Sequence, residues 1–534
     1  MGWEILNGNK EGNEQGEWTY VRARGESSID YGIVNEEAWE EIERFEVGEK
    51  MPVIMLIVVV IIVICFYFSF DSRKYPPGPW NLPLIGYLYK LDKKTPNLDL
   101  MQLAQKYGPI YTIKLGLTNT VVIAEAKLLK KVLLKDQVLA RPPLLTFQMM
   151  FGEKGLTCCW PLHMWKNQRK FVADFLRTVG ATKTATNKST LEQLIRKSAE
   201  NFVQDIHSRG DRTLLDPSEA VGNYVSTIVH TLLLGTSFSR DENTQIDLSS
   251  NIDDVSKMTF CSRLNFLPFA QFLPQYRKMK NVFKQTMEKI RHTQEKFVNT
   301  GVSNFSKNNT SLIDTFLTEM ARNGSDEIYN AEQLKQLLFD LFAASTETTV
   351  HSIRWLLLYL ARYQEVQSKV RRELLQVLQG KPPDTGDLAK LGYMKATIAE
   401  IARIRTLVPL GFPRYATEDF CVDNMTIKKD SLIIPLLWAI HMDPKVWEKL
   451  EEFSPDRFLD GEGKFCKHES LVPFQAGKRM CVGKHLANMM MFQFVATVLQ
   501  KVKIECCGSD PVDFSYECGL SLLPKPQKLV FVKI

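Results

Sequence analysis

The segment PFQAGKRMCVGKHLANMM, residues 473–490, is the most informative part of the sequence. It places Cys481 between Gly477 and Gly483 and then continues into a segment with helical periodicity. A cysteine in a turn is most often a small buried residue with no chemistry of its own. Glycines on both sides of the thiol indicate a tight turn of the backbone. The rest of the chain decides between a structural cysteine and a metal ligand.

The composition is that of a globular protein. With 534 residues, the chain is long enough for more than one domain, or for one large domain with appendages, and it has 45% hydrophobic and 24% charged residues. Its ten cysteines include no CxxC pair, which argues against a zinc ribbon or a thioredoxin-like motif. Adjacent cysteines, as at 158–159 and 506–507, form disulfides poorly. We therefore expect most of the chain to lie in a reducing compartment.

Charge is divided unevenly along the chain. The formal net charge is +6, and since residues 1–50 carry −8, the remainder carries +14. A basic body suits an acidic protein partner or an anionic membrane surface. Aromatic residues do not alternate with basic runs, so we expect no nucleic-acid partner.

Residues 51–70, MPVIMLIVVVIIVICFYFSF, contain no charge and are predicted to form a transmembrane signal anchor. As a helix they extend roughly 30 Å, the hydrocarbon thickness of a bilayer. Arg73 and Lys74 follow and acidic residues precede, so the positive-inside rule places the C-terminal body in the cytosol. The proline-rich linker 71–80 is expected to be stiff and extended.

Residues 1–50 are polar and acidic and lack clear periodicity. Met51 would by itself begin an ordinary signal-anchor protein. Our hypothesis is that Met51 is the natural start and that residues 1–50 are an artefact of the gene model or of upstream translation. The alternative is a disordered lumenal tail.

Residues 81–534 are predicted to form a single large domain, mainly α with small β-sheets, because no internal linker divides them. We expect helices at residues 97–107, 165–178, 189–208, 217–234, 276–300, 311–323, 331–363, 365–379 and 483–500. We expect strands at residues 110–115, 120–123, 421–427 and 431–435, with a C-terminal hairpin formed by 520–523 and 529–533.

The middle of the 331–363 helix breaks its own pattern. Ser345-Thr346-Glu347-Thr348-Thr349 concentrates poor helix formers between apolar flanks. Such hydroxyls tend to bond to carbonyls one turn earlier. A local violation of this kind is where a functional site is expected.

Four motifs occur in order. They are Ala344-Ser345-Thr346-Glu347-Thr348, Glu400-x-x-Arg403, Pro455-Asp456-Arg457-Phe458 and Phe474-x-x-Gly477-x-Arg479-x-Cys481-x-Gly483. With these motifs the chain resembles the cytochrome P450 haem-thiolate family, specifically its microsomal animal type. Within that type it looks most like the arthropod members. The resemblance covers residues 76–534. A lone ExxR would carry no weight, whereas the cysteine loop in register with the other three motifs is highly specific.

The resemblance implies haem, with Cys481 as the thiolate ligand of iron. A thiolate pushes electron density onto iron and favours O–O cleavage. We expect the helix that begins at Val482 to favour the anionic sulfur, and Gly477 and Gly483 to let the backbone approach the haem. The expected haem-contacting residues, which include those that reach the propionates, are Trp165, Arg169, Arg414, Phe474, Gly477, Arg479 and Gly483.

Other roles follow from the same resemblance. Glu400, Arg403 and Arg457 correspond to a buried structural ion triad, and Glu347 with Thr348 corresponds to the acid–alcohol pair that delivers protons for oxygen activation. Two positions depart from the family pattern. Ser345 replaces a usual glycine and would crowd the oxygen groove or add a hydrogen bond there, and Thr406 stands where proline is common.

The activity implied is insertion of one oxygen atom from O2 into a lipophilic substrate, such as a steroid hormone or a xenobiotic. The partners implied are an NADPH-cytochrome P450 reductase and cytochrome b5, at the cytosolic face of the endoplasmic reticulum membrane. The expected substrate-facing residues are Phe147, Phe339, Phe342, Ala343, Val408, Leu410, Phe412 and Leu520. The alternatives are a reductase-independent haem-thiolate isomerase or lyase, and a non-catalytic membrane haem- or sterol-binding protein.

Overall fold

The computed structural model describes residues 19–20, 33–34, 55, 57–62, 75–182, 189–235, 251–257, 263–303, 305, 311–324, 326–508 and 511–534. The chain divides into two units, Met1–Asp71 and Ser72–Ile534. In the first, β1 (Thr19–Tyr20) pairs antiparallel with β2 (Ile33–Val34), and residues 55 and 57–62 are helical. Within the described ranges, no helix combines the length and apolar character needed to cross a bilayer. Most of the predicted anchor, residues 51–70, lies outside those ranges.

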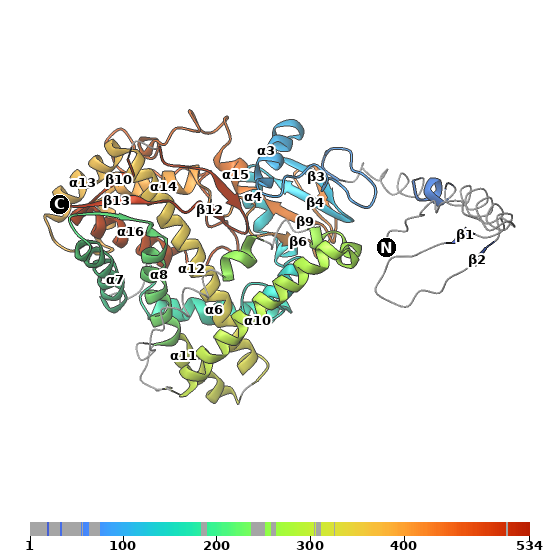
Figure 1. The fold of residues 1–534 in the computed structure, drawn as a ribbon, viewed down its shortest axis with the longest axis horizontal. Coiled ribbons are helices and arrows are strands. Elements are labelled where there is room, and N and C mark those ends of the chain that lie inside the picture. Colours follow the sequence, from blue (N-terminus) through green and yellow to red (C-terminus); the bar gives the residue numbers. More distant parts are fainter. Residues whose placement is uncertain are drawn as a thin grey trace. The chain divides into compact units, whose positions relative to one another are not determined.

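The second unit is mainly helical, as predicted (Figure 1). Its helices are α3 (Pro96–Tyr107), α4 (Ala126–Leu133), α5 (Leu145–Phe151), α6 (Leu162–Thr178), α7 (Ser189–Ser208), α8 (Pro217–Leu234), α10 (Pro274–Ser303), α11 (Leu312–Asn323), α12 (Ala331–Arg362), α13 (Gln364–Leu378), α14 (Gly392–Ile404), α15 (Leu437–His441) and α16 (Lys484–Lys501). Residues 251–257 are also helical, and short 3₁₀ turns include Pro268–Phe272 and Pro455–Phe458.

Small sheets accompany the helices. A mixed sheet has the order β3 (Ile110–Leu115), β4 (Thr118–Ile123), β9 (Leu432–Pro435), β6 (Arg414–Tyr415), in which only β4 and β9 are parallel. An antiparallel sheet has the order β10 (Val502–Cys506), β13 (Leu529–Lys533), β5 (Arg212–Leu215). Two hairpins complete the set, β7 (Phe420–Val422) with β8 (Met425–Ile427) and β11 (Tyr516–Cys518) with β12 (Leu522–Pro524).

The predicted C-terminal hairpin is wrong. β12 pairs with β11, whereas β13 pairs with β10 and β5. Both C-terminal segments alternate well as strands, but the edges that complete β13 come from residues far away in the sequence. Local pattern identifies a strand and leaves its partner undetermined.

Helix α12 runs through the centre of the second unit (Figure 1). It packs against α8, α10, α14 and α16, which explains why it is apolar nearly all round. Its start is fixed by the Asn330 side chain, which accepts a hydrogen bond from the Gln333 amide at 3.0 Å. In the middle of α12 the side chains of Thr346, Glu347 and Thr349 are therefore buried, whereas those of Ser345 and Thr348 are half-buried.

Asp340 on α12 fixes the loop that follows α5. One oxygen of its buried carboxylate accepts the amides of Leu156 and Thr157, each at 2.7 Å, and Gln336 donates to the other at 2.8 Å. Burial raises the pKa of Asp340 to about 6, although these hydrogen bonds oppose the shift. The loop is thus positioned by one acceptor group in the core.

We predict that Asp340→Ala destabilises the domain more than Asp340→Asn. Alanine leaves two buried amides without an acceptor, at a cost of about 1–3 kcal/mol each, whereas the asparagine oxygen still accepts both. The measurement is the urea midpoint of haem-loaded protein for the two variants and the wild type. Equal midpoints for Ala and Asn would show that the loop does not depend on this acceptor.

Candidate functional site

The cysteine loop is closed by its own backbone. The Cys481 amide donates to the Phe474 carbonyl at 3.2 Å, and Met480 donates to the Gly477 carbonyl at 3.0 Å. Gly477 has φ +75°, and a Cβ there would lie 2.0 Å from the Leu133 carbonyl oxygen. Only glycine satisfies both the backbone angle and the close approach.

Gly483 does not share this requirement. It has φ −83°, and a Cβ there would meet nothing within 4 Å. It is the N-cap of α16, which begins at Lys484 and not at Val482 as predicted. The backbone angle and the neighbouring protein atoms therefore do not require glycine here, and the approach of Gly483 to the haem stays a prediction.

The Cys481 thiol has an exposed side, but its surroundings do not ionise it unaided. Burial raises the pKa of the Cys481 thiol, and the backbone amide of Gly483, the Arg169 guanidinium and Lys484 oppose this only in part. The predicted helix-terminus effect is thus present but weaker than burial. A bound metal ion holds a cysteine as thiolate because its own charge dominates the site.

Four arginines gather beside the cysteine loop, and we call Arg141, Arg169, Arg414 and Arg479 the arginine cluster. The Thr157 carbonyl accepts from Arg141 at 3.2 Å and from Arg479 at 3.0 Å. The Phe412 carbonyl accepts from Arg141 at 3.2 Å and from Arg414 at 2.9 Å. Arg169 donates to the Met480 carbonyl at 2.7 Å.

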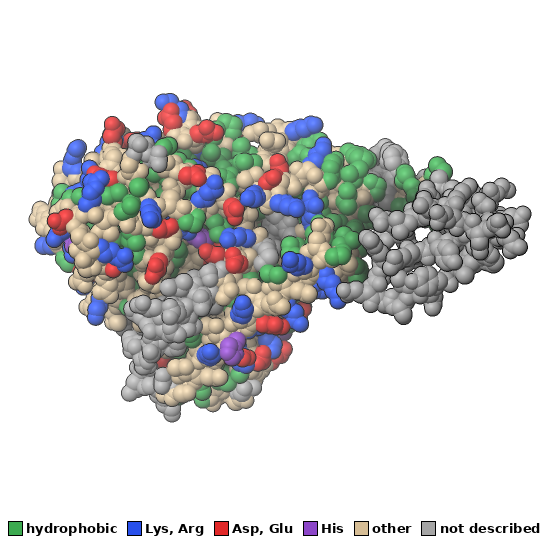
Figure 2. All heavy atoms as spheres, viewed as in Figure 1, with side chains coloured by type: hydrophobic (Ala, Val, Ile, Leu, Met, Phe, Trp, Pro, Cys, Tyr) green, Lys and Arg blue, Asp and Glu red, His purple; other side chains and the backbone are tan. Residues whose placement is uncertain are grey.

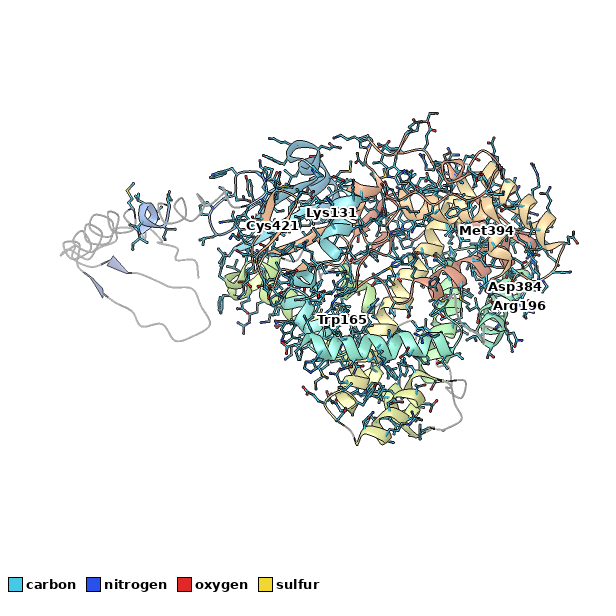
Figure 3. All side chains as sticks on the ribbon, turned by 180° about the vertical axis from the view of Figure 1, so that it is seen from behind. Lys131, Trp165, Arg196, Asp384, Met394 and Cys421 are labelled. Carbon is cyan, nitrogen blue, oxygen red and sulfur yellow. The ribbon has the colours of Figure 1, made fainter. Side chains whose placement is uncertain are left out.

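Trp165 organises part of this cluster from α6, where Figure 3 labels it. The guanidinium carbon of Arg479 lies 4.2 Å from the centre of its ring, and that of Arg169 lies 5.9 Å away. The buried indole therefore supports two cations through cation–π contacts. Sequence reasoning found all of these residues except Arg141, which precedes two prolines and resembles any loop arginine.

Buried positive charge remains uncompensated at this place. Burial lowers the pKa of Arg414 to about 9 and of Arg479 to about 10, and each arginine has another arginine near it that adds to the shift. No carboxylate among the described residues pairs with either, and Nε and Nη2 of Arg479 are buried without a hydrogen-bond partner. Buried charges are normally paired. The site therefore fits a dianionic group such as the two propionates of haem, beside a cysteine able to ligate its iron.

Glu400, Arg403 and Arg457 come together as a buried ion triad. Arg403 forms a fork with both Glu400 oxygens, at 2.7 and 2.8 Å, and Arg457 Nε lies 3.1 Å from Glu400 Oε1. The Ser454 amide also donates to Glu400 Oε1 at 3.1 Å. Helix α14 is thereby tied to the Pro455–Phe458 turn.

Thr406, the departure from proline, takes part in a second connection. Its hydroxyl donates to the Arg403 carbonyl at 2.9 Å and lies 2.8 Å from His441 Nδ1. His441 Nε2 accepts the Val472 amide at 3.0 Å, so Nδ1 carries the proton and donates to Thr406. This buried chain links the end of α14 to the start of the cysteine loop, a contact that proline could not make.

The hydroxyls in the middle of α12 bond to their own helix as predicted. Ser345 donates to the Leu341 carbonyl and Thr348 to the Ala344 carbonyl, each one turn earlier. The Ser345 hydroxyl is therefore directed along the helix. Thr346 Oγ1, in contrast, is buried without a partner.

Glu347 is buried and accepts two hydroxyl donors from outside α12. Ser256 donates to Glu347 Oε1 at 2.7 Å and Ser521 donates to the same oxygen at 2.6 Å. Burial raises the pKa of Glu347. Neither serine could be found from the sequence, because both contacts join segments far apart in the chain.

The predicted substrate-facing residues separate into groups. Phe147 lies 5.3 Å from Phe412 and packs with Phe151, which lies 6.1 Å from Phe339, ring centre to ring centre. Phe342 instead stacks on His230 at 4.9 Å. Ala343 is buried, Val408 is half-buried, Leu410 borders a hollow next to α3 and Leu520 donates its amide to Ser256. The structure therefore brings together three of the eight residues as one aromatic cluster.

The chain is similar to known proteins along most of its length. The family described as cytochrome P450 matches residues 76–531. Among curated proteins, the chain is 29% identical over 513 residues to Cytochrome P450 306a1 of Drosophila melanogaster, covering 86% of this chain and 89% of that protein. It is 30% identical to Cytochrome P450 2J3 of Rattus norvegicus, covering 86% and 91%, and 32% identical to Cytochrome P450 2L1 of Panulirus argus, covering 80% and 87%.

We predict that His441 makes the domain less stable in mild acid. Burial lowers the pKa of His441 from 6.5 to about 3, so between these values the unfolded chain binds a proton that the folded chain does not. Stability contributed by neutral His441 is complete above the unfolded pKa and falls as the pH drops below it, by up to roughly 1.4 kcal/mol per pH unit.

The measurement compares wild type with His441→Gln, which removes the titrating group, in urea unfolding from neutral pH to about pH 5. The difference in unfolding free energy between the two should shrink as the pH falls. A difference that stays constant with pH would contradict the assignment of His441 as a buried neutral group.

Proposed function

Since the chain belongs to the cytochrome P450 family, a haem monooxygenase family whose members bind haem through a cysteine thiolate, we propose that Cys481 is its haem ligand and that it oxidises a lipophilic substrate. The observation that carries this proposal is the arginine cluster beside the Cys481 loop, with buried guanidinium groups of Arg414 and Arg479 that have no protein carboxylate.

Each residue of the site then has a task. Arg141, Arg169, Arg414 and Arg479 bind the propionates, with Trp165 holding two of them, and the loop Phe474–Cys481 presents the sulfur. When bound, the haem supplies activation of O2 and transfer of one oxygen atom. Glu347 holds the proton that this chemistry consumes, with Thr348 on the next residue of α12, and the burial of Glu347 limits the access of water to it.

A lipophilic substrate is supported by the aromatic cluster. Phe147, Phe151, Phe339 and Phe412 come from α5, α12 and the segment before β6, and their rings lie edge-on or tilted to one another. Steroid-like hormones and apolar xenobiotics are the substrate classes we propose, since such a surface offers contact area and few hydrogen bonds.

Membrane attachment is supported by exposed apolar side chains in the second unit. Trp80, Leu117 and Phe272 are 65%, 62% and 79% exposed. The segments that carry them adjoin, because Gly78 closely approaches the Thr112 carbonyl and Gly116 the Phe266 carbonyl. Figure 2 shows hydrophobic side chains gathered on this part of the molecule. Together with residues 51–70 they suit a cytosolic domain anchored in the endoplasmic reticulum membrane.

Electrons are proposed to come from NADPH through a flavoprotein reductase, with cytochrome b5 as a further donor. Lys166 and Lys170 on α6 and Lys478 in the cysteine loop are exposed, and Lys166 and Lys478 both lower the pKa of Asp136. These three lysines form a basic face beside the Cys481 loop. Such a face suits the acidic surface of an electron donor.

We predict that the dithionite-reduced protein with carbon monoxide shows the strongly red-shifted Soret band of a thiolate-ligated haem. Cys481→Ser should lose the band, because a hydroxyl is a poor ligand and does not donate electron density as a thiolate does. Cys421→Ser, at the exposed β7 position labelled in Figure 3, is the matched control and should keep it. Retention of the band in Cys481→Ser would overturn the proposal.

We also predict that Lys166→Glu weakens reductase coupling. Charge reversal on the basic face should raise the reductase concentration needed for half-maximal NADPH oxidation, on the order of tenfold at low salt and less at high salt. Lys197→Glu is the control, since Lys197 is exposed on α7 beside Arg196, which Figure 3 shows far from Trp165. Equal effects of the two variants would place the docking surface elsewhere.

A further inference from the structure

Polar side chains lead from the surface to buried Glu347, with hydrogen-bond distances at the inner steps and a longer separation at the outermost one. Ser521 donates to Glu347 Oε1 at 2.6 Å, and His351 Nδ1 lies 3.1 Å from the Ser521 hydroxyl. His351 Nε2 lies 3.7 Å from Asp253 Oδ2. The His351 side chain is 1% exposed, whereas that of Asp253 is 33% exposed. The chain therefore begins in contact with solvent and ends in the interior.

Three segments hold these groups in place. Glu347 and His351 lie one turn apart on α12, Asp253 lies in the helical residues 251–257, and Ser521 lies between β11 and β12. The Leu520 amide donates to the Ser256 carbonyl at 3.1 Å, which fixes the hairpin to the second of these segments. One nitrogen of His351 and one oxygen each of Asp253 and Glu347 all lie within 4.8 Å of one another.

The donors and acceptors have one consistent direction. Because Ser521 gives its proton to Glu347, its oxygen accepts from His351, and so Nδ1 of His351 carries the proton. The lone pair of Nε2 then faces Asp253. A neutral imidazole in this tautomer can accept a proton from the outer side and release one on the inner side.

We propose that Asp253, His351 and Ser521 conduct protons from solvent to Glu347. A proton that arrives by way of Asp253 binds Nε2 of His351, the Nδ1 proton moves to the Ser521 oxygen, and the Ser521 proton moves to the Glu347 carboxylate. Rotation of the Ser521 hydroxyl and return of His351 to its starting tautomer restore the chain. The inference rests on the proposed function, because Glu347 is the destination.

The proposed relay would supply the protons that each turnover of a monooxygenase consumes. A monooxygenase that takes two electrons from a reductase also consumes two protons for each O2, since one oxygen atom enters the substrate and the other leaves as water. The Glu347 side chain is buried, and its hydrogen-bond donors are the hydroxyls of Ser256 and Ser521, so it has no direct contact with bulk water. Each turnover requires that carboxyl to be protonated again.

Other charged groups lie near Asp253 and His351 and contribute to the electrostatic potential there. Arg354 on α12 interacts with Asp253 and with Asp216, the N-cap of α8, and donates to the Pro524 carbonyl at 3.2 Å. Lys257 pairs with Asp254 on the outer side of residues 251–257. Asp253 is thus the acid that faces His351 from this segment. It is the group we expect to collect protons.

The first test reads the tautomer directly. Protein labelled with 15N-histidine, in its diamagnetic ferrous carbon-monoxide form, should show His351 as the neutral Nδ1–H tautomer, with the signal assigned by its loss in His351→Gln. Ser521→Thr keeps the acceptor and should keep this tautomer, whereas Ser521→Val, of nearly the same shape, should lose the preference. A wild-type Nε2–H tautomer overturns the proposal.

The second test follows proton supply. With NADPH and excess reductase and no added substrate, O2 consumption per carbon-monoxide-binding haem is measured in H2O and D2O. Positioned proton transfer typically contributes about 10²–10⁴-fold, and water can replace one hydroxyl in part, so we expect a loss of roughly tenfold in Ser521→Val. The solvent isotope effect should rise in that variant. Ser521→Thr should be close to wild type, and Asp253→Asn should be intermediate.

The variant Glu347→Gln distinguishes failure of the relay from failure of the proposed role of Glu347. If Glu347→Gln slows O2 consumption and Ser521→Val does not, the relay is overturned while the proposed role of Glu347 stands. If Glu347→Gln has no effect, both fail together. If Ser521→Thr and Ser521→Val are equally slow, Ser521 acts through packing alone and the relay is likewise overturned.

Discussion

The structure depends most on one buried carboxylate. Glu400 is fully buried and holds Arg403 in a fork and Arg457 at 3.1 Å, so a single charge fixes α14 against the turn that precedes the cysteine loop. Removing charges from water is costly, and such a group is stable only when its oxygens are all used. The carboxylate meets this condition because the Ser454 amide supplies a further donor.

The arginine cluster differs from the ion triad because its buried charges have no partner of opposite sign among the described residues. The arginine cluster concentrates positive charge where the described chain offers no carboxylate, and burial lowers the pKa of Arg414 and Arg479. In the ion triad, the charges of Arg403 and Arg457 are paired with Glu400. The arginine cluster has no such carboxylate and needs an anion from outside the chain. A dianionic cofactor that binds only the folded state adds to its stability. The proposed ligand Cys481 would depend on the charge of the bound metal to remain a thiolate, because burial raises the pKa of its thiol.

Much of this could be predicted from the sequence because the informative residues are close together in it. The loop Phe474–Cys481 and the pair Glu400 and Arg403 each act within one local segment, and long patterned helices such as α12 were predicted within a residue or two. Long-range partners could not be predicted. The strand order β10-β13-β5, the place of Arg141 in the cluster and the serines on Glu347 all join segments that the sequence separates widely. The sequence also could not show that the φ of Gly483 is one that any residue adopts.

The middle of α12 contains two kinds of polar side chain, those that bond within the helix and one that bonds to other segments. The hydroxyls of Ser345 and Thr348 donate to carbonyls one turn earlier in the same helix, so their polarity is satisfied locally. Glu347 differs because its partners come from other segments, and those partners continue through His351 to Asp253. A carboxyl bonded only within its own helix would be isolated in the core. A carboxyl bonded to other segments can be connected to solvent through them, and this requires further polar groups to be buried. Among residues 345–349 of α12, Glu347 is therefore the one through which the proposed relay exchanges protons.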